Sequence, residues 1–287
     1  MCLLLFYINP FAKENEYYLI LTNVRDEIYT RPTKVAHFWK QNQNIIGGVD
    51  AELGKEGGTW LAMNQNGKIG ALLNILQPDE EVLPNKKGRG FLAVDYVAGQ
   101  SDCFSYLHAI NQEKQNYNGF LLVTMDIRSL HDPKIAYVTN ASSTPPVRLN
   151  PGFHAFGNSV TPETPWPKVM KAKEKFTEIV QRHLSLKTKD ALVEDIFTLL
   201  RDSTSYLLDE NMKKQGKSKP SEFLDKLSAI FVNIPSSNYG SRCHTVIIVD
   251  GSGKVDYFEH SRAEVPSSDG DATWTTKKYS YELVCDK

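Results

Sequence analysis

The order of apolar patterns along the 287 residues predicts an α+β protein in which antiparallel sheets stack in a layered sandwich. Strand-length apolar runs dominate the first half of the chain, helical periodicity begins near residue 167, and strand patterns return after residue 229. Separate blocks of strands and helices disfavour a doubly wound parallel sheet, in which the two alternate. The length and the ordinary globular composition suit one large domain over residues 1–287 as well as two small ones.

Strand patterns come first. Asn9-Pro10 follows the first apolar run as a turn, so the chain opens with a hairpin, and Gly67 separates a second strand pair. Residues 91–113 place apolar side chains at helical spacing and predict one or two helices. The strands predicted in this half are residues 2–8, 17–24, 59–64, 69–76, 120–126 and 135–139.

Helical periodicity starts at Pro167, and a second helix is predicted to start near Thr188, a suitable N-cap residue. Residues 209–221 are rich in lysine, contain Gly216 and Pro220, and predict a flexible loop. The apolar stripe of the first helix comprises Met170, Phe176, Ile179, Val180 and Leu184. The last strands are predicted at 229–234, 243–250, 254–259 and 274–284.

Charge and residue usage exclude several classes of protein. The chain has 33 Lys and Arg against 34 Asp and Glu, so no overall positive field favours nucleic acid. The longest apolar run, residues 2–8, is far shorter than a membrane span, and we expect a cytoplasmic protein without stable membrane insertion. No Cys-x-x-Cys pair occurs, and the seven histidines do not show metal-ligand spacing, so no metal site is expected.

Cys2 is the first candidate for chemistry. If Met1 is removed, the chain begins with a free α-amine beside a thiol, which together can act as base and nucleophile. Arg25, near the end of the second predicted strand, would supply the positive charge that depresses a thiol pKa. Strand alternation places Arg25 and Asp26 on opposite faces. The alternatives are a buried, structural Cys2 and a surface turn at Arg25 and Asp26.

Several motifs occur together and in order along the chain. They are Met-Cys-Leu-Leu-Leu-Phe at 1–6, Val-Arg-Asp-Glu at 24–27, Tyr-Thr-Arg-Pro at 29–32 and Gly-Lys-Glu-Gly-Gly-Thr-Trp-Leu at 54–61. With Asn74, Arg89 and the segments 117–120, 163–166 and 239–242, they make the sequence resemble the transport and Golgi organisation protein 2 family, the Asn-Arg-Asp-Glu proteins. Val24 stands where the family has its leading Asn.

The resemblance implies a fold and a set of site residues. This family is similar to the cysteine N-terminal-nucleophile hydrolases, which have a four-layer αββα sandwich and attack amide bonds with the N-terminal cysteine. The implied catalytic residues are Cys2, Arg25, Asp26, Asn74, Asn158 and Arg242. Asp26 follows Arg25 directly, whereas in the hydrolases the Asp lies three residues after the Arg.

Each of the other candidates has a structural alternative. Asn74 can be a strand-end residue, Asn158 can occupy a turn, and Arg242 can be solvated. Gly57 and Gly58 precede Trp60, so this segment can bring a flat ligand against an indole wall or form a tight turn packed by a core Trp.

The resemblance also implies two functions. One is haem trafficking, in which a carrier moves haem out of storage organelles or mitochondria and binds it with Arg25, Gly57, Gly58, Trp60 and Arg242. The other is a Cys2-dependent amidohydrolase or acyl thioester hydrolase in lipid and acyl-CoA metabolism. The expected partner is a small hydrophobic anion, haem or acyl-CoA. No cofactor is required, and the family suggests association with mitochondria, the Golgi or lysosome-related organelles.

Overall fold

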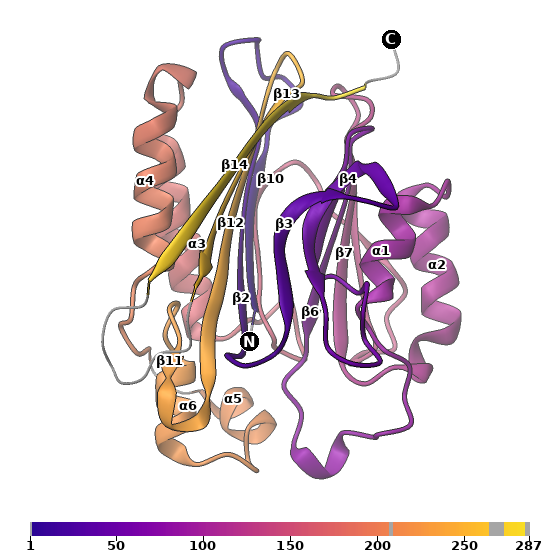
Figure 1. The fold of residues 1–287 in the computed structure, drawn as a ribbon, viewed down its shortest axis with the longest axis vertical. Coiled ribbons are helices and arrows are strands. Elements are labelled where there is room, and N and C mark those ends of the chain that lie inside the picture. The colour runs from indigo at the N-terminus through magenta and orange to yellow at the C-terminus, as the bar shows by residue number, and fades with distance from the viewer. Residues whose placement is uncertain (1, 207–208, 264–272, 285–287) are drawn as a thin grey trace.

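Two seven-stranded antiparallel sheets form the centre of the computed structural model, which describes residues 2–206, 209–263 and 273–284 (Figure 1). In the first sheet the strand order is β10-β1-β2-β12-β13-β14, and β11 pairs with β12. Its strands are β1 (Cys2–Ile8), β2 (Tyr17–Ile28), β10 (Gly152–Phe156), β11 (Asn233–Ile234), β12 (Tyr239–Asp250), β13 (Lys254–Arg262) and β14 (Trp274–Glu282).

The second sheet follows the chain order from β3 to β9. Each strand pairs with its sequence neighbour, which short connections allow in an antiparallel sheet. Its strands are β3 (Thr33–Trp39), β4 (Asn42–Asp50), β5 (Leu61–Asn64), β6 (Lys68–Asn74), β7 (Phe120–Asp126), β8 (Lys134–Thr139) and β9 (Val147–Arg148).

Helices cover the outer faces of both sheets. The pair α1 (Phe91–Ala98) and α2 (Cys103–Glu113) packs on β5 to β8, and the pair α3 (Pro167–Arg182) and α4 (Lys189–Leu200) packs on β1, β10 and β12. The predicted four-layer αββα sandwich is therefore confirmed (Figure 1). The remaining helices are α5 (Glu210–Gln215), α6 (Ser221–Leu227) and the short 3-10 turns η1 (Asp79–Glu81), η2 (Lys114–Asn116), η3 (Leu186–Thr188) and η4 (Pro235–Ser237).

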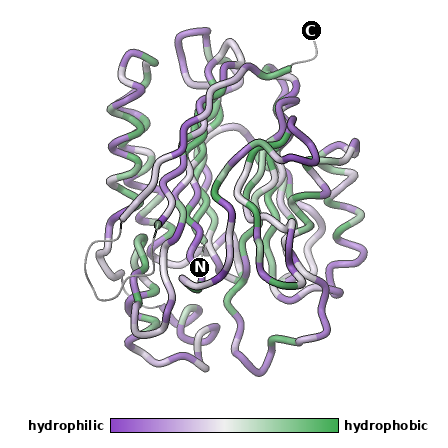
Figure 2. The backbone as a smooth tube through the Cα atoms, viewed as in Figure 1, coloured by the Kyte–Doolittle hydropathy of each residue, from purple (hydrophilic) through white to green (hydrophobic). Residues whose placement is uncertain are grey.

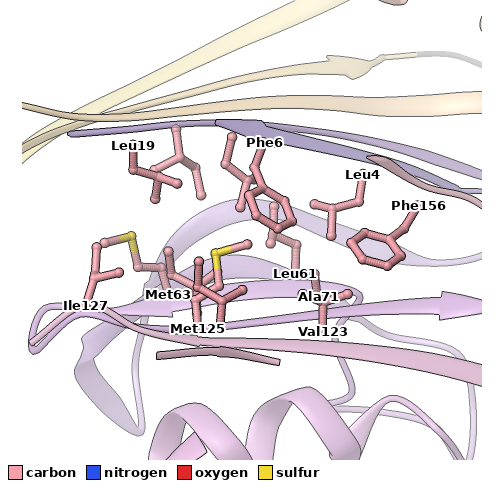
Figure 3. Close-up of a cluster of buried hydrophobic side chains, with 14 of the residues drawn as sticks. Leu4, Phe6, Leu19, Leu61, Met63, Ala71, Val123, Met125, Ile127 and Phe156 are labelled. Atoms are coloured by element: carbon pink, nitrogen blue, oxygen red, sulfur yellow. The ribbon is translucent and has the colours of Figure 1, made fainter. Parts of the chain in front are cut away.

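The core has three apolar layers, one between the sheets and one under each helix pair. Between the sheets, Leu4 and Phe6 of β1 face Leu61 and Met63 of β5 (Figure 3). Alternate residues such as Leu3 and Leu5 point to the α3–α4 side. A strand buried on both faces reads as a continuous apolar run, which explains the sequence of β1. Figure 2 shows hydrophobic residues concentrated on the central strands.

Some elements differ from the sequence-based expectation. Strands β3 and β4 were not predicted, because β3 is an edge strand and both contain exposed polar positions that weaken the apolar pattern. The predicted loop at 209–221 contains α5, because Asp209 caps the helix and Met212 is buried. Residues 229–234 form a strand only over the two residues of β11.

The apolar stripe of α3 is narrower than predicted. Met170 and Leu184 are 60% and 61% exposed, whereas Phe176, Ile179 and Val180 are buried. Among the described residues, no helix has both the length and the hydrophobicity that crossing a bilayer requires.

Candidate active and ligand-binding cleft

Cys2 lies at the start of β1, in a cleft of about 470 Å³. The antiparallel register places Cys2 opposite Arg25 of β2, and Arg25 opposite Cys243 of β12. Residues directly opposite one another in such a sheet share a face. The three side chains therefore form a row on the face that looks toward the second sheet.

Arg25 is held on several sides within this row. It is only 5% exposed, and its guanidinium stacks on the Trp60 ring at 4.2 Å from the ring centre. Its Nη2 lies 3.5 Å from Glu27 Oε2, and its Nη1 donates to Thr33 Oγ1 at 3.3 Å. Arg25 thus lies beside the Cys2 thiol as predicted from the hairpin.

Burial nevertheless dominates the ionisation of Cys2. The side chain is 7% exposed, and burial raises the pKa of the thiol; Asp26 adds to the rise, and Arg25 opposes it. Arg25 lowers the pKa of the thiol, as expected, but burial raises this pKa by more. At neutral pH the protonated thiol is the prevalent form.

Asn158 fixes the backbone of Cys2. It is fully buried, its Oδ1 accepts from the Cys2 nitrogen at 2.8 Å, and its Nδ2 donates to the Asn74 carbonyl oxygen. Gln215 Nε2 holds the Asn158 carbonyl oxygen at 3.0 Å. Asn158 therefore ties the first strand of one sheet to the end of β6 in the other. The Asn74 side chain is exposed and lines the cleft.

Asp26 and Arg242 are directed differently. Asp26 lines the cleft, but its Oδ1 accepts from Ser241 Oγ at 2.6 Å on the neighbouring strand. The register between β2 and β12 shifts at this point, because Ser241 pairs with Asp26 and Cys243 with Arg25. Arg242 is thus the extra residue of a bulge, which turns its side chain aside.

Arg242 instead binds the segment that follows β2. Its Nη1 donates to the carbonyl oxygens of Arg31 at 2.6 Å and Ile28 at 3.2 Å. It lines a separate cavity of about 60 Å³ behind Arg25, together with Thr33 and Glu259. The structure does not bring Arg242 to the wall of the Cys2 cleft.

The glycine-rich segment forms one wall of the cleft. Gly58 approaches Gly90 so closely that a Cβ on Gly90 would lie 2.9 Å from the Gly58 Cα, and both residues line the cleft. Trp60 lies against Gly48, where a Cβ would meet the indole at 2.3 Å. Gly57 has a φ of 92° and only supports the turn, outside the cleft lining.

The sequence-based predictions missed several cations of the cleft. Arg31 binds Asp50 at 2.7 Å, and Lys55, Lys86, Lys87 and Arg89 come from loops that have no periodicity to mark them. Arg89 is among the residues that carry the family resemblance and lies in a Gly-Arg-Gly run at 88–90, but neither signal assigned it a role in the site. Burial lowers the pKa of Arg89, and Cys2 and Glu27 are among its electrostatic neighbours.

A larger groove of about 1090 Å³ lies elsewhere, between α3 and β10. Its lining includes Phe156, Val169 and Met170 and none of the predicted site residues. Within the described residues, no three His, Cys, Asp or Glu side chains are grouped so that they could hold a metal ion.

Comparison with known proteins identifies the family. The family model described as Transport and Golgi organisation 2 matches residues 1–264. The chain belongs to the Transport and Golgi organisation 2 family. It is 36% identical over 284 residues to the Homo sapiens Transport and Golgi organization protein 2 homolog, covering 99% of each chain. It is 31% identical over 271 residues to the Drosophila melanogaster Transport and Golgi organization protein 2, covering 91% of this chain and 92% of the relative.

Two solved structures are similar to this chain at low sequence identity. The Caenorhabditis elegans N-acylethanolamine-hydrolyzing acid amidase ortholog has a TM-score of 0.47 and 10% identity, covering 86% of this chain and 92% of that chain. A variant of the conjugated bile acid hydrolase from Clostridium perfringens has a TM-score of 0.46 and 10% identity, covering 100% of this chain and 99% of that chain.

Proposed function

We propose that this member of the Transport and Golgi organisation 2 family is a haem-trafficking carrier that binds haem in the Cys2 cleft. The charge of the cleft carries the proposal. Six basic side chains line it against three carboxylates, and two of the carboxylates, Glu27 and Asp50, are already paired with Arg25 and Arg31. An excess of cations suits the propionates of haem, because guanidinium and ammonium groups bind carboxylates well.

The size and composition of the cleft also support this ligand class. A volume of about 470 Å³ lies within the usual range for small-molecule sites. Leu72, Val82, Leu83 and Phe91 provide apolar surface, and the Cys2 sulfur is a candidate ligand for iron. In this proposal haem is cargo, and the protein requires no cofactor.

A titration of the purified protein with haem, followed by visible absorption, tests the carrier. We expect saturable binding, and about tenfold weaker binding in Lys55→Glu/Lys86→Glu, which reverses two cleft charges. The exposed Lys254, outside the cleft lining, provides the control Lys254→Glu, for which binding should match the wild type. A wild-type titration without saturation, or an unchanged affinity in the double variant, would contradict the carrier.

A second function is favoured by one contact. Asn158 holds the Cys2 nitrogen in the cleft, so a free α-amine at this position would lie beside its own thiol. Cys2 would then act as an amidohydrolase or acyl thioester hydrolase. Its sulfur would bond the acyl carbon while the amine took the thiol proton and passed it to the departing amine or thiol. Water would then release the acid and restore the thiol.

Two measurements test the hydrolase. Intact mass spectrometry reports whether Met1 is removed, and we expect its loss if the amine is the base. Palmitoyl-CoA and palmitoyl ethanolamide serve as thioester and amide probes, with Cys2→Ala as the inactive control. Retention of Met1 in the purified protein would rule out the amine as base.

The proposed place of action is the cytoplasm, with association with mitochondria, the Golgi or lysosome-related organelles. The names of the relatives refer to transport and the Golgi. Subcellular fractionation of the tagged protein tests this, and its absence from both cytosolic and organelle fractions of these kinds would contradict it.

A further inference from the structure

Arg89 differs from the other arginines of the cleft in its charge balance. Arg25 lies near Glu27, and Arg31 binds both Glu27 and Asp50. Among the described residues, Arg89 has no carboxylate within ion-pair distance, and its Nη1 donates to the Gly119 carbonyl oxygen at 2.7 Å. A half-buried guanidinium that binds only a backbone oxygen retains donors for an anion.

The surroundings of Arg89 direct those donors toward the Cys2 cleft. Arg89 lines the cleft between Gly88 and Gly90, and its electrostatic neighbours include Cys2 and Glu27. Lys55 reaches the same segment, because a Cβ on Gly88, the residue before Arg89, would meet Lys55 Nζ at 3.6 Å, and both cations line the cleft. Two cations from different loops thus line the cleft that also contains the thiol.

We propose that Arg89, assisted by Lys55, is the anion-recognition residue of the cleft and binds the carboxylate or phosphate of an otherwise apolar ligand next to Cys2. This inference deepens the proposed function, on which it rests, by assigning the residue that recognises the negative charge of the ligand. Selection by Arg89 acts through charge, so a neutral ligand of the same shape is excluded.

Alkylation of Cys2 tests the inference without any biological ligand. Iodoacetate is anionic and iodoacetamide is neutral, so the ratio of their rates at the Cys2-containing peptide, measured by mass spectrometry, reports the local positive charge. In Arg89→Gln, which retains a donor for Gly119 but loses the charge, we expect this ratio to fall by about three- to tenfold. Arg89→Lys should restore most of it.

Arg182→Gln is the matched control. Arg182 is an exposed arginine in the last turn of α3, far along the helix from Lys168, which neighbours Cys2 electrostatically. The ratio of iodoacetate to iodoacetamide rates in Arg182→Gln should equal that of the wild type. A ratio in Arg89→Gln equal to that of the wild type would overturn the inference, and circular dichroism of each variant checks that the fold is retained.

Protection of Cys2 from iodoacetamide then distinguishes the two sources of the anion. We expect octanoate, octyl phosphate or both to slow alkylation of the wild type, and methyl octanoate to have little effect. Protection by only one anion identifies its source. Loss of that protection in Arg89→Gln supports the inference, whereas equal protection by the neutral ester overturns it. These results do not depend on haem, so failure of haem to bind would contradict the carrier alone.

Discussion

At the residue scale, the outcome for Cys2 depends on two opposing effects. Arg25 lies beside the thiol and lowers its pKa, but burial raises it by more. The position of Cys2 was therefore easier to predict from the sequence than its reactivity. Burial also protects the thiol, which suits a binding residue at least as well as a nucleophile.

His244 allows a prediction about pH and stability. It is fully buried, stacks on Trp274, and has no hydrogen-bond partner for either ring nitrogen among the described residues. Burial, aided by nearby cations such as Arg201, lowers the pKa of His244 to about 3. An exposed histidine in the unfolded chain titrates near pH 6.5.

Between these two pKa values the unfolded chain binds a proton that the native protein does not. Above about pH 6.5 His244 is neutral in both states and does not change the free energy of unfolding. As the pH falls from there toward 3, only the unfolded chain gains the proton, so the free energy of unfolding decreases. At pH 5 the loss should be about 2 kcal/mol relative to pH 7. Urea unfolding of the wild type and of His244→Phe, which retains an aromatic ring, measures this difference. Equal losses in both proteins would contradict it.

At the element scale, the cleft depends on contact between two loops. The loop after β4 and the loop before α1 touch through Gly58 and Gly90, where a Cβ would lie 2.9 Å from backbone. Two glycines allow this approach, and any side chain at Gly90 must push the loops apart. The sequence showed glycines in both loops but could not show that they meet.

Gly90→Ala should therefore open the cleft. We expect a loss of about 1–3 kcal/mol in stability and weaker haem binding, because the new methyl group overlaps backbone atoms that cannot rotate away. Gly88→Ala is the control, since its Cβ would meet only the Lys55 side chain at 3.6 Å. Chemical unfolding and haem titration of both variants measure these effects. A Gly90→Ala protein with wild-type stability and affinity would show that the loop contact is unimportant.

At the scale of the whole molecule, the cleft lies where the two sheets meet. Cys2 and Arg25 come from the first sheet, Trp60 and Asn74 lie at or near strands of the second, and Asn158 links the two. The apolar layer between the sheets holds these residues in place (Figure 3). Binding geometry and global stability should thus be coupled.

We expect one cooperative unfolding transition, because both sheets contribute to the same inter-sheet core. Leu4→Ala in the first sheet and Leu61→Ala in the second should each lower the free energy of unfolding by about 2–5 kcal/mol. Circular dichroism and tryptophan fluorescence should give the same midpoint for each variant. Two separate transitions would contradict a single domain over residues 1–287.

The sequence by itself determined most of the strand and helix blocks, though not β3, β4 or α5, together with the opening hairpin and the side-by-side placement of Cys2 and Arg25. These features follow from local periodicity and short turns, which act over a few residues. Alternation along β2 predicted different directions for Arg25 and Asp26, and Asp26 does bind Ser241, although both residues line the cleft.

Only the tertiary structure decided how the site is completed. The bulge that turns Arg242 away arises from pairing between β2 and β12, and contact between two loops brings Lys55 and Arg89 to the same cleft. Burial of Cys2 likewise requires both sheets. Register, loop contact and desolvation depend on groups distant in sequence, so periodicity and spacing contain no direct measure of them.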